Sequence, residues 1–262
     1  MTGRSGSADD PENVSAVLAA LRPDHPVTLR FTVAGHQQRR AFAALGPNLH
    51  GVGVRQVAFF DTPDLALRRS GVVAAARRTQ HGEAEVSIRV RATAPGSGLP
   101  GAAWSTSVEV DVDGVTAALT CVCSADAGAA DEKVRALLSG RLHLGDLLDD
   151  VQLRVWERWV PHAVGPRDLQ VLGPVHMLTR RYFPGWYRRT LTAETWFVPG
   201  DPPLLDLVVQ ATPATACRLA ETTTRALAAR GVALHTLAES APRSVFAALA
   251  AARTGEVSAR PS

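Results

Sequence analysis

Charged side chains recur at every second position in two short apolar segments. In one, Arg89 and Arg91 alternate with Ile and Val, and in the other Glu109 and Asp111 alternate with valines. Residues two apart in a strand point to the same face. Arginine binds planar oxyanions through its guanidinium fork, and a buried carboxylate can act as a general acid or base. These residue types in this pattern could therefore hold an anion and move a proton beside it.

The periodicity of these segments leaves two arrangements open. In an ordinary barrel, the apolar face of each strand forms the core and the charged face meets water. In a hydrophilic tunnel, the charged face lines the interior and helices cover the apolar face. A period of two residues is common to both arrangements, so the sequence does not choose between them.

The elements that position these residues are strands and helices without a regular strand–helix–strand repeat. Strand patterns cover residues 27–33, 54–60, 72–79, 86–91, 107–112, 117–124, 151–159, 188–198 and 204–210. Helical patterns cover residues 13–22, 36–45, 131–139, 213–230 and 242–253. We expect one domain over residues 13–253, between disordered tails at 1–12 and 254–262. The order of elements predicts an α+β fold with an antiparallel barrel.

The composition excludes several classes of protein. The 262 residues include 28 basic and 25 acidic side chains, and Lys133 is the single lysine. A net charge of +3 with scattered arginines does not indicate a nucleic-acid or membrane surface. Three cysteines, without the spacing of a disulfide framework or zinc site, predict a reduced protein. With a polar N-terminus and no long apolar segment, we expect a cytoplasmic location.

Common catalytic motifs are missing from the sequence. It has no Gly-rich phosphate loop, no His-Glu-x-x-His and no Gly-x-Ser-x-Gly. The aromatic residues concentrate between positions 156 and 197 and include Tyr182 and Trp196. Such a group usually forms core, although an organic ligand pocket would use the same residues.

One segment is more specific than these general patterns. Residues 58–72 read Ala-Phe-Phe-Asp-Thr-Pro-Asp-Leu-Ala-Leu-Arg-Arg-Ser-Gly-Val, with Asp61 opening the Asp-Thr-Pro turn. This run resembles the CYTH, or triphosphate tunnel, family, in which a strand ends in an aromatic-Asp-Thr-Pro turn before a short helix and a glycine. Weaker similarity extends over residues 26–250.

The resemblance implies an eight-stranded antiparallel tunnel with helices packed outside. In that family, inward-facing basic residues hold a triphosphate chain and inward-facing glutamates hold magnesium or manganese. Its activities include tripolyphosphate and thiamine triphosphate hydrolysis and one class of adenylyl cyclase. A multiply charged phosphate needs several cations around it, and a hard divalent metal needs oxygen ligands.

The sequence departs from the family pattern where the metal would bind. The family signature is Glu-x-Glu-x-Lys, but the first strand here reads Pro26-Val-Thr-Leu-Arg30, so both glutamates are missing. Neutral residues stand where bases are expected in later strands, namely Ala75, Thr179, Gln210 and Ala241. Loss of two carboxylate ligands should remove most of the affinity for a divalent metal.

Three functions follow as hypotheses. The first is a repurposed tunnel that binds a small anionic organic substrate and acts without a cofactor, as a cyclase, lyase or isomerase of specialised metabolism. The second is a divergent triphosphatase or adenylyl cyclase that uses Mg or Mn at residual carboxylates. The third is a catalytically inactive anion-binding or scaffold module. We expect neither a nucleic-acid nor a membrane partner, and the sequence does not define the oligomeric state.

The residues that match the family pattern, together with two residues of the aromatic group, define the predicted site. The catalytic candidates, which are also the residual metal-ligand candidates, are Glu109, Glu194 and Asp206. The substrate-binding candidates are Arg30, Arg77, Arg89, Arg91, Arg154, Arg181, Tyr182, Trp196 and Arg243. Asp111 and Asp113 flank the turn at Gly114 and are expected to face solvent, and Asp61 is expected to form its turn.

Overall fold

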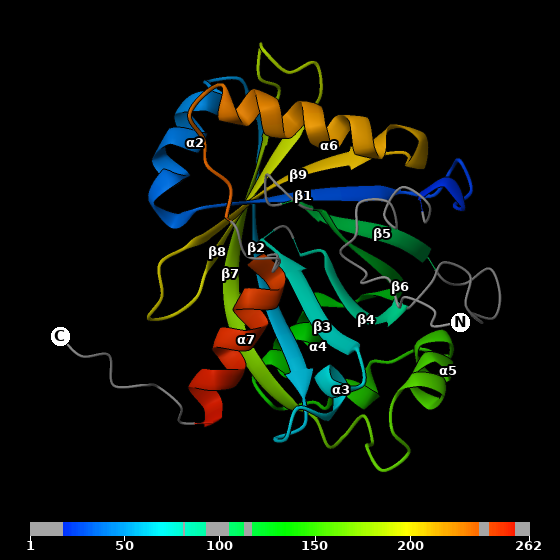
Figure 1. The fold of residues 1–262 in the computed structure, drawn as a ribbon. Helices are drawn as coiled ribbons and strands as arrows, with labels where there is room; N and C mark the ends of the chain where they lie inside the picture. The colour runs from blue at the N-terminus through cyan, green and yellow to red at the C-terminus, as the bar shows by residue number, and fades with distance from the viewer. Residues whose placement is uncertain (1–17, 81, 93–104, 113–116, 236–240, 255–262) are drawn as a thin grey trace.

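The computed structural model describes residues 18–80, 82–92, 105–112, 117–235 and 241–254. Within these ranges, nine strands form one closed barrel (Figure 1). Helices pack on its outer face as predicted, except that the C-terminal helix packs against its interior face. Neighbouring strands follow the order β1-β5-β6-β4-β3-β2-β7-β8-β9 and return to β1. The barrel fixes which side chains point inward, and these are the residues that matter for function.

The strand bounds agree with most of the sequence predictions. The strands are β1 (Val27–Val33), β2 (Leu49–Asp61), β3 (Val72–Thr79), β4 (Ala84–Ala92), β5 (Ser105–Val112), β6 (Ala117–Ala129), β7 (Gln170–Tyr182), β8 (Leu191–Phe197) and β9 (Leu204–Ala211). The helices are η1 (Gly35–Gln37), α2 (Gln38–Leu45), α3 (Ala66–Arg69), α4 (Asp131–Leu138), η2 (Leu144–Asp146), α5 (Asp150–Trp159), α6 (Pro213–Ala228) and α7 (Ala241–Thr254). Half of the helix predicted at 13–22, residues 13–17, lies outside the described residues.

The prediction of an eight-stranded, wholly antiparallel barrel is wrong in two respects. The barrel contains nine strands, and β1 and β5 pair in parallel while the other eight neighbouring pairs are antiparallel. β5 pairs with β6 along one edge and with β1 along the other. The second edge of β1 pairs with β9. The first strand of the barrel therefore closes it.

The apolar faces of the strands point outward, which confirms the tunnel arrangement. In β1, Val27, Leu29 and Phe31 are fully buried and pack in one core with residues of α2 and α6. Figure 1 shows α6 lying along β1 and β9. The alternate residues of β1 face the barrel interior. The helices thus take the place of solvent on the apolar side.

The segment predicted as a strand at 151–159 is the helix α5. Asp149 accepts a hydrogen bond from the Gln152 backbone N–H at 2.8 Å, and the Gln152 side-chain oxygen accepts one from the Asp149 backbone N–H, so the two form a capping box. Gln152 is buried, and its Nε2 donates to the Val86 and Ala125 carbonyls on the barrel wall. Local capping and these contacts outweigh the strand-like alternation of the segment.

The turn after β2 is held by one buried carboxylate. Asp61 accepts hydrogen bonds from the backbone N–H groups of Thr62, Leu67 and Arg68. These bonds cap α3 and confirm Asp61 as a turn former.

No described helix is both long enough and apolar enough to cross a bilayer.

Candidate functional site

The polar faces of five strands meet α7 inside the barrel. We call the charged residues there the interior charge cluster: Arg30 (β1), Arg89 (β4), Glu109 and Asp111 (β5), Glu194 (β8), Asp206 (β9) and Arg243 (α7). Strand register brings them together, since Thr28 lies opposite Glu109 and Thr32 lies opposite Asp206. Residues far apart in the sequence thus share one space.

Arg30 lies between three carboxylates. Its guanidinium is 2.7 Å from Glu194, 3.6 Å from Asp206 and 4.0 Å from Glu109. Burial works against the charged form, but these carboxylates outweigh it and raise the pKa of Arg30 further above its usual range. Its Nε has no hydrogen-bond partner among the described residues. Arg30 therefore neutralises the acidic side of the cluster.

Glu109 lies in the field of several arginines. It is 3.6 Å from Arg89 and also lies near Arg243 and Arg77. Burial alone would raise the pKa of Glu109, but Arg30 and the other arginines hold the pKa below its usual range. Glu109 therefore lacks the raised pKa that a buried general acid would need near neutral pH. Its carboxylate stays ionised.

Arg89 is less well neutralised than Arg30. Among the described residues it has one ion pair, to Glu109 at 3.6 Å, which is too long for a hydrogen bond. Glu109 is also shared with Arg30. Burial and the nearby Arg77 lower the pKa of Arg89 from its usual range. About a third of the side chain, 31%, is exposed. The guanidinium can thus accept a further negative charge.

Asp111 is buried, contrary to the prediction that it faces solvent. The residue is 7% exposed, and neither carboxylate oxygen has a hydrogen-bond partner among the described residues. Arg243 lies 3.6 Å away. Burial raises the pKa of Asp111 to about 7, and the Arg243 charge only partly opposes this. Asp113 lies outside the described residues.

The first turn of α7 meets Asp206. The fully buried Asp206 accepts a hydrogen bond from the Thr32 hydroxyl at 2.7 Å and one from the Ala241 backbone N–H at 3.2 Å. Burial raises the pKa of Asp206 to about 6, although Arg30 and Thr32 favour the charged form. Asp206 thus contacts Ala241 and Asp111 contacts Arg243, so two carboxylates of the barrel contact the first turn of α7.

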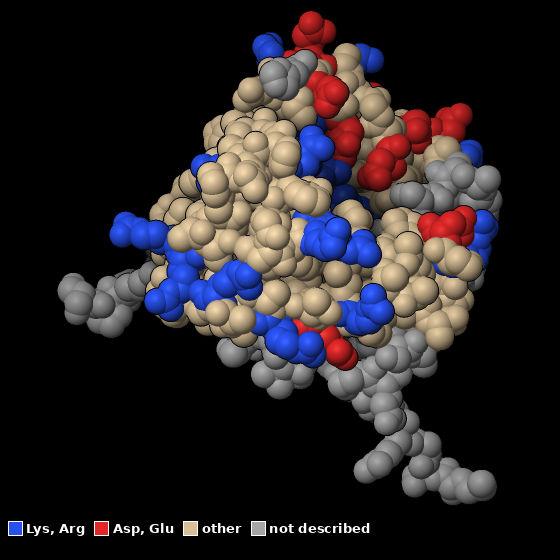
Figure 2. Space-filling view, turned by 90° about the horizontal axis from the view of Figure 1, so that it is seen from above, with Lys and Arg blue, Asp and Glu red and all other residues tan. Residues whose placement is uncertain are grey.

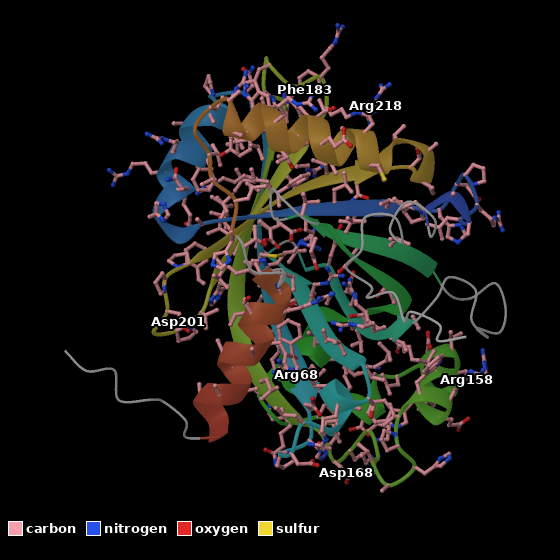
Figure 3. All side chains as sticks on the ribbon, viewed as in Figure 1. Arg68, Arg158, Asp168, Phe183, Asp201 and Arg218 are labelled. Carbon is pink, nitrogen blue, oxygen red and sulfur yellow. The ribbon has the colours of Figure 1, made fainter. Side chains whose placement is uncertain are left out.

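The rest of α7 packs on an apolar part of the same interior face. We call this surface the α7 seat: Val57 and Phe59 (β2), Ala75 (β3), Met177 (β7) and Trp196 (β8), which form one core with Val245 and Phe246 of α7. The Phe246 ring meets the Phe59 ring edge-on at a centroid distance of 5.5 Å. The Arg68 guanidinium lies over the Phe246 ring, beside α7 (Figure 3).

The remaining predicted binding residues are not all in the cluster. Arg77 of β3 pairs with Glu85, and Arg91 and Arg181 lie exposed near strand ends. Trp196 faces the interior but is covered in the α7 seat.

Two predicted binding residues lie outside the barrel. Tyr182 points outward and is buried in the core beneath α2 and α6. Arg154 lies on the exposed side of the helix α5, so the prediction that it binds substrate in the tunnel is wrong.

Neutral residues at the positions of lost bases have structural partners. The Thr179 hydroxyl donates to the Gly53 carbonyl at 3.0 Å, and the Thr28 hydroxyl donates to Gln210 at 3.3 Å. Ala75 and Ala241 are buried against α7 or within it. These residues complete the wall and the seat of the helix.

The described residues do not fit a divalent-metal site. They contain no group of three or more His, Cys, Asp or Glu side chains that could hold a metal ion. The three residual candidates, Glu109, Glu194 and Asp206, all face the Arg30 guanidinium, which occupies the place of a cation. Function without a cofactor stays a prediction.

One face of the molecule is hollowed. Figure 2 shows acidic side chains gathered along one side of a hollow and basic side chains deeper within it. A surface of mixed charge, with arginine at depth, suits a ligand of low negative charge.

The fold has relatives among solved structures. It is similar to HpAC1 from Hippeastrum, described as a candidate adenylyl cyclase with a dominant triphosphatase activity, with a TM-score of 0.60, 14% identity, and coverage of 84% of this chain and 94% of that one. It is also similar to a candidate adenylate cyclase from Bacillus halodurans, with a TM-score of 0.54, 10% identity, and coverage of 84% and 96%. No protein-family model and no curated protein matches the sequence.

These likenesses and the inward polar faces define a CYTH-like tunnel fold. The resemblance in residues 58–72 therefore identified the fold correctly. At this level of identity, the comparisons establish the architecture and leave the reaction to be argued from the site.

Proposed function

We propose that this chain binds a small organic anion in its tunnel and catalyses proton transfer without a metal, as a cyclase, lyase or isomerase. The observation that carries the proposal is Arg89. Its guanidinium faces the interior and is partly exposed, and its one ion pair with a described residue is the long contact with Glu109, which Arg30 shares. An incoming carboxylate, enolate or single phosphate would accept bidentate hydrogen bonds from the Arg89 guanidinium.

The charge balance of the cluster favours a ligand with few negative charges. Three arginines, Arg30, Arg89 and Arg243, face four carboxylates in the cluster. A triphosphate chain carries several negative charges and needs an excess of cations. A singly or doubly charged organic acid needs one arginine that is incompletely paired, which the tunnel offers at Arg89.

The cluster also contains groups that exchange protons near neutral pH. Asp206 has a pKa of about 6 because it is buried. A general acid or base works best when its pKa is close to the operating pH. Glu194 lies beside Asp206 on the neighbouring strand and holds Arg30 at 2.7 Å. We assign proton transfer to this carboxylate pair, with Arg30 keeping it in place.

The fold likeness to HpAC1 favours a second candidate, metal-dependent triphosphate chemistry. That reading needs carboxylates free to bind a metal. Here, the three candidates are engaged by Arg30. We therefore place this function second, as the competing outcome of the test.

The test uses C–H exchange as a general readout of proton transfer. The protein is incubated in D₂O with EDTA and a panel of small keto and hydroxy acids, and deuterium incorporation is followed by NMR. We expect catalysed exchange for at least one acid and its loss in Arg89→Ala. Arg218→Ala, on the exposed side of α6 (Figure 3), removes the same charge away from the tunnel and should retain exchange.

The competing function is tested in parallel. The protein is incubated with tripolyphosphate or ATP and Mn²⁺, and phosphate and cyclic nucleotide are measured. Turnover that requires Mn²⁺, with no exchange in EDTA, would overturn the proposal in favour of the second candidate. Absence of both activities would favour an inactive anion-binding module.

A further inference from the structure

Among the cluster carboxylates, Asp111 is the one with two fully buried oxygens that both lack a hydrogen-bond partner in the described part of the chain. It is 7% exposed and projects from β5 into the barrel interior, beside Arg30 in the strand register. A buried carboxylate without hydrogen bonds is unfavourable in its charged form. Asp111 therefore differs from Asp206, whose oxygens accept bonds from Thr32 and Ala241.

Four charged groups face Asp111 from the surrounding elements. Glu109 lies on its own strand, Arg30 on β1, Asp206 on β9 and Arg243 on α7. The closest cation is Arg243 at 3.6 Å. With two carboxylates and two arginines around it, Asp111 keeps its charge mainly through the contact with Arg243.

We infer that binding of an anion in the tunnel is coupled to uptake of one proton by Asp111. This inference rests on the proposed function and adds a role for a residue outside the predicted site. The anion held by Arg89 also takes as a partner the Arg243 guanidinium, which acts on the same Glu109 carboxylate as Arg89. Asp111 then loses its closest cation. The carboxylate then lies between Glu109 and the new negative charge, and it becomes protonated.

The exchange balances without any other reactant. One anion enters, and one proton passes from hydronium or a buffer acid in the solvent to an Asp111 oxygen. The net charge of the cluster is then unchanged for a singly charged anion and falls by one for a dianion. No covalent bond other than that O–H bond forms. The protonated carboxyl is then a hydrogen-bond donor next to the bound anion. A substrate that gains negative charge during its reaction would be stabilised by this donor.

The coupling is measured with ethane-1,2-disulfonate, an organic dianion that does not titrate between pH 6 and pH 8. Isothermal titration calorimetry gives its Kd at both pH values, with EDTA present. For the wild-type protein, we expect the Kd to rise about tenfold from pH 6 to pH 8, because binding requires a protonated group with a pKa close to 7. In Asp111→Asn, the Kd should be the same at both values.

A second measurement counts the protons directly. Titrations at pH 7 in two buffers with different ionisation enthalpies give the number of protons taken up per anion. We expect about half a proton for the wild type, since about half of the Asp111 population is already protonated, and close to none for Asp111→Asn. Asp168→Asn, an exposed residue far from α7 (Figure 3), is the matched control and should behave as wild type.

The outcomes separate the two proposals. Binding that is independent of pH, or an equal pH dependence in Asp111→Asn, would overturn the coupling and leave the anion site standing. Absence of binding at either pH in the wild type would overturn both. Circular dichroism of each variant shows that the comparison is made on folded protein.

Discussion

The interior of this barrel has two regions that use the same inward-facing positions in opposite ways. In the interior charge cluster, strands β5, β8 and β9 place carboxylates around Arg30 of β1. In the α7 seat, strands β2, β3 and β7 place apolar side chains against Val245 and Phe246. The barrel geometry is shared, so residue type alone decides whether a wall binds charge or a helix.

The comparison explains the missing bases. A cation at Ala75 would need water or an anion beside it, and either would keep α7 from packing there. With Ala75 at that position and Met177 in the same apolar surface, the barrel wall packs against a helix instead. The loss of charge on one side of the tunnel and the packing of α7 are thus one structural change.

The largest effect is expected from removing the centre of the charge cluster. Arg30→Gln leaves Glu109, Glu194 and Asp206 without their common cation, and we expect a loss of about 4 kcal/mol of unfolding free energy at pH 8. The loss should be smaller at pH 5, where the carboxylates are more easily protonated. Urea denaturation at both pH values measures this. A loss that does not depend on pH would contradict the electrostatic account, and Arg218→Gln serves as the control.

The α7 seat should respond to a different substitution. Phe246 is 6% exposed and packs on Phe59 and Arg68, so Phe246→Ala should cost about 3 kcal/mol through the cavity that it leaves. The loss should be equal at pH 5 and pH 8. Phe197→Ala, where the ring is 43% exposed, should cost about 0.5 kcal/mol. Similar losses in the two variants would mean that α7 is not held by this contact.

Asp111→Asn should make the protein more stable at high pH. Because the pKa of Asp111 is raised to about 7 by burial, the native state binds a proton that the unfolded state releases between about pH 4 and pH 7. Wild-type stability therefore falls as pH rises through this window, and Asn abolishes that pH dependence. We expect the variant to gain roughly 1–3 kcal/mol relative to wild type between pH 4 and pH 8. Thermal unfolding across this range would show a pH-independent difference if Asp111 were freely solvated.

The smallest effect on stability is expected where a base is restored. Thr179 lies opposite Glu194 in the β7–β8 register, and its side chain is partly exposed. Thr179→Lys should change the unfolding free energy by less than about 1 kcal/mol, because the new charge has a carboxylate neighbour. Binding of tripolyphosphate, measured by calorimetry, should become roughly threefold to tenfold tighter as the cation excess grows. Weaker binding would show that charge does not limit this ligand.

Most strands and helices could be predicted because the signals for them, alternation and helix-end residues, lie within or next to each element. The alternation in β1 and β3 gave their bounds, and Gly231, with a positive φ of 69°, follows the end of α6 as expected. The segment around Val151 and Val155 misled because alternation and helix spacing overlap in it. The Asp149–Gln152 capping box was the available signal for α5.

The site was harder to predict because its environment comes from distant parts of the chain. The shared face of Glu109 and Asp111 was visible in the sequence, and the structure places both inside the barrel. Burial of Asp111 depends on Arg243 and α7, which only the fold brings to β5. The effect of Arg89 and Arg243 on the pKa of Glu109 is also a tertiary property.

The position of β1 has a consequence for how the chain folds. This strand is the first of the described strands to be synthesised, yet its two neighbours are β5 and β9. Its pairing with β9 joins Val27 to Ala211, so β1 remains with an open edge until nearly the whole barrel sequence is available. Contacts between such distant residues slow folding through the entropy of closing a long loop. Barrel closure, and with it the assembly of the site around Arg30, is therefore a late event in folding.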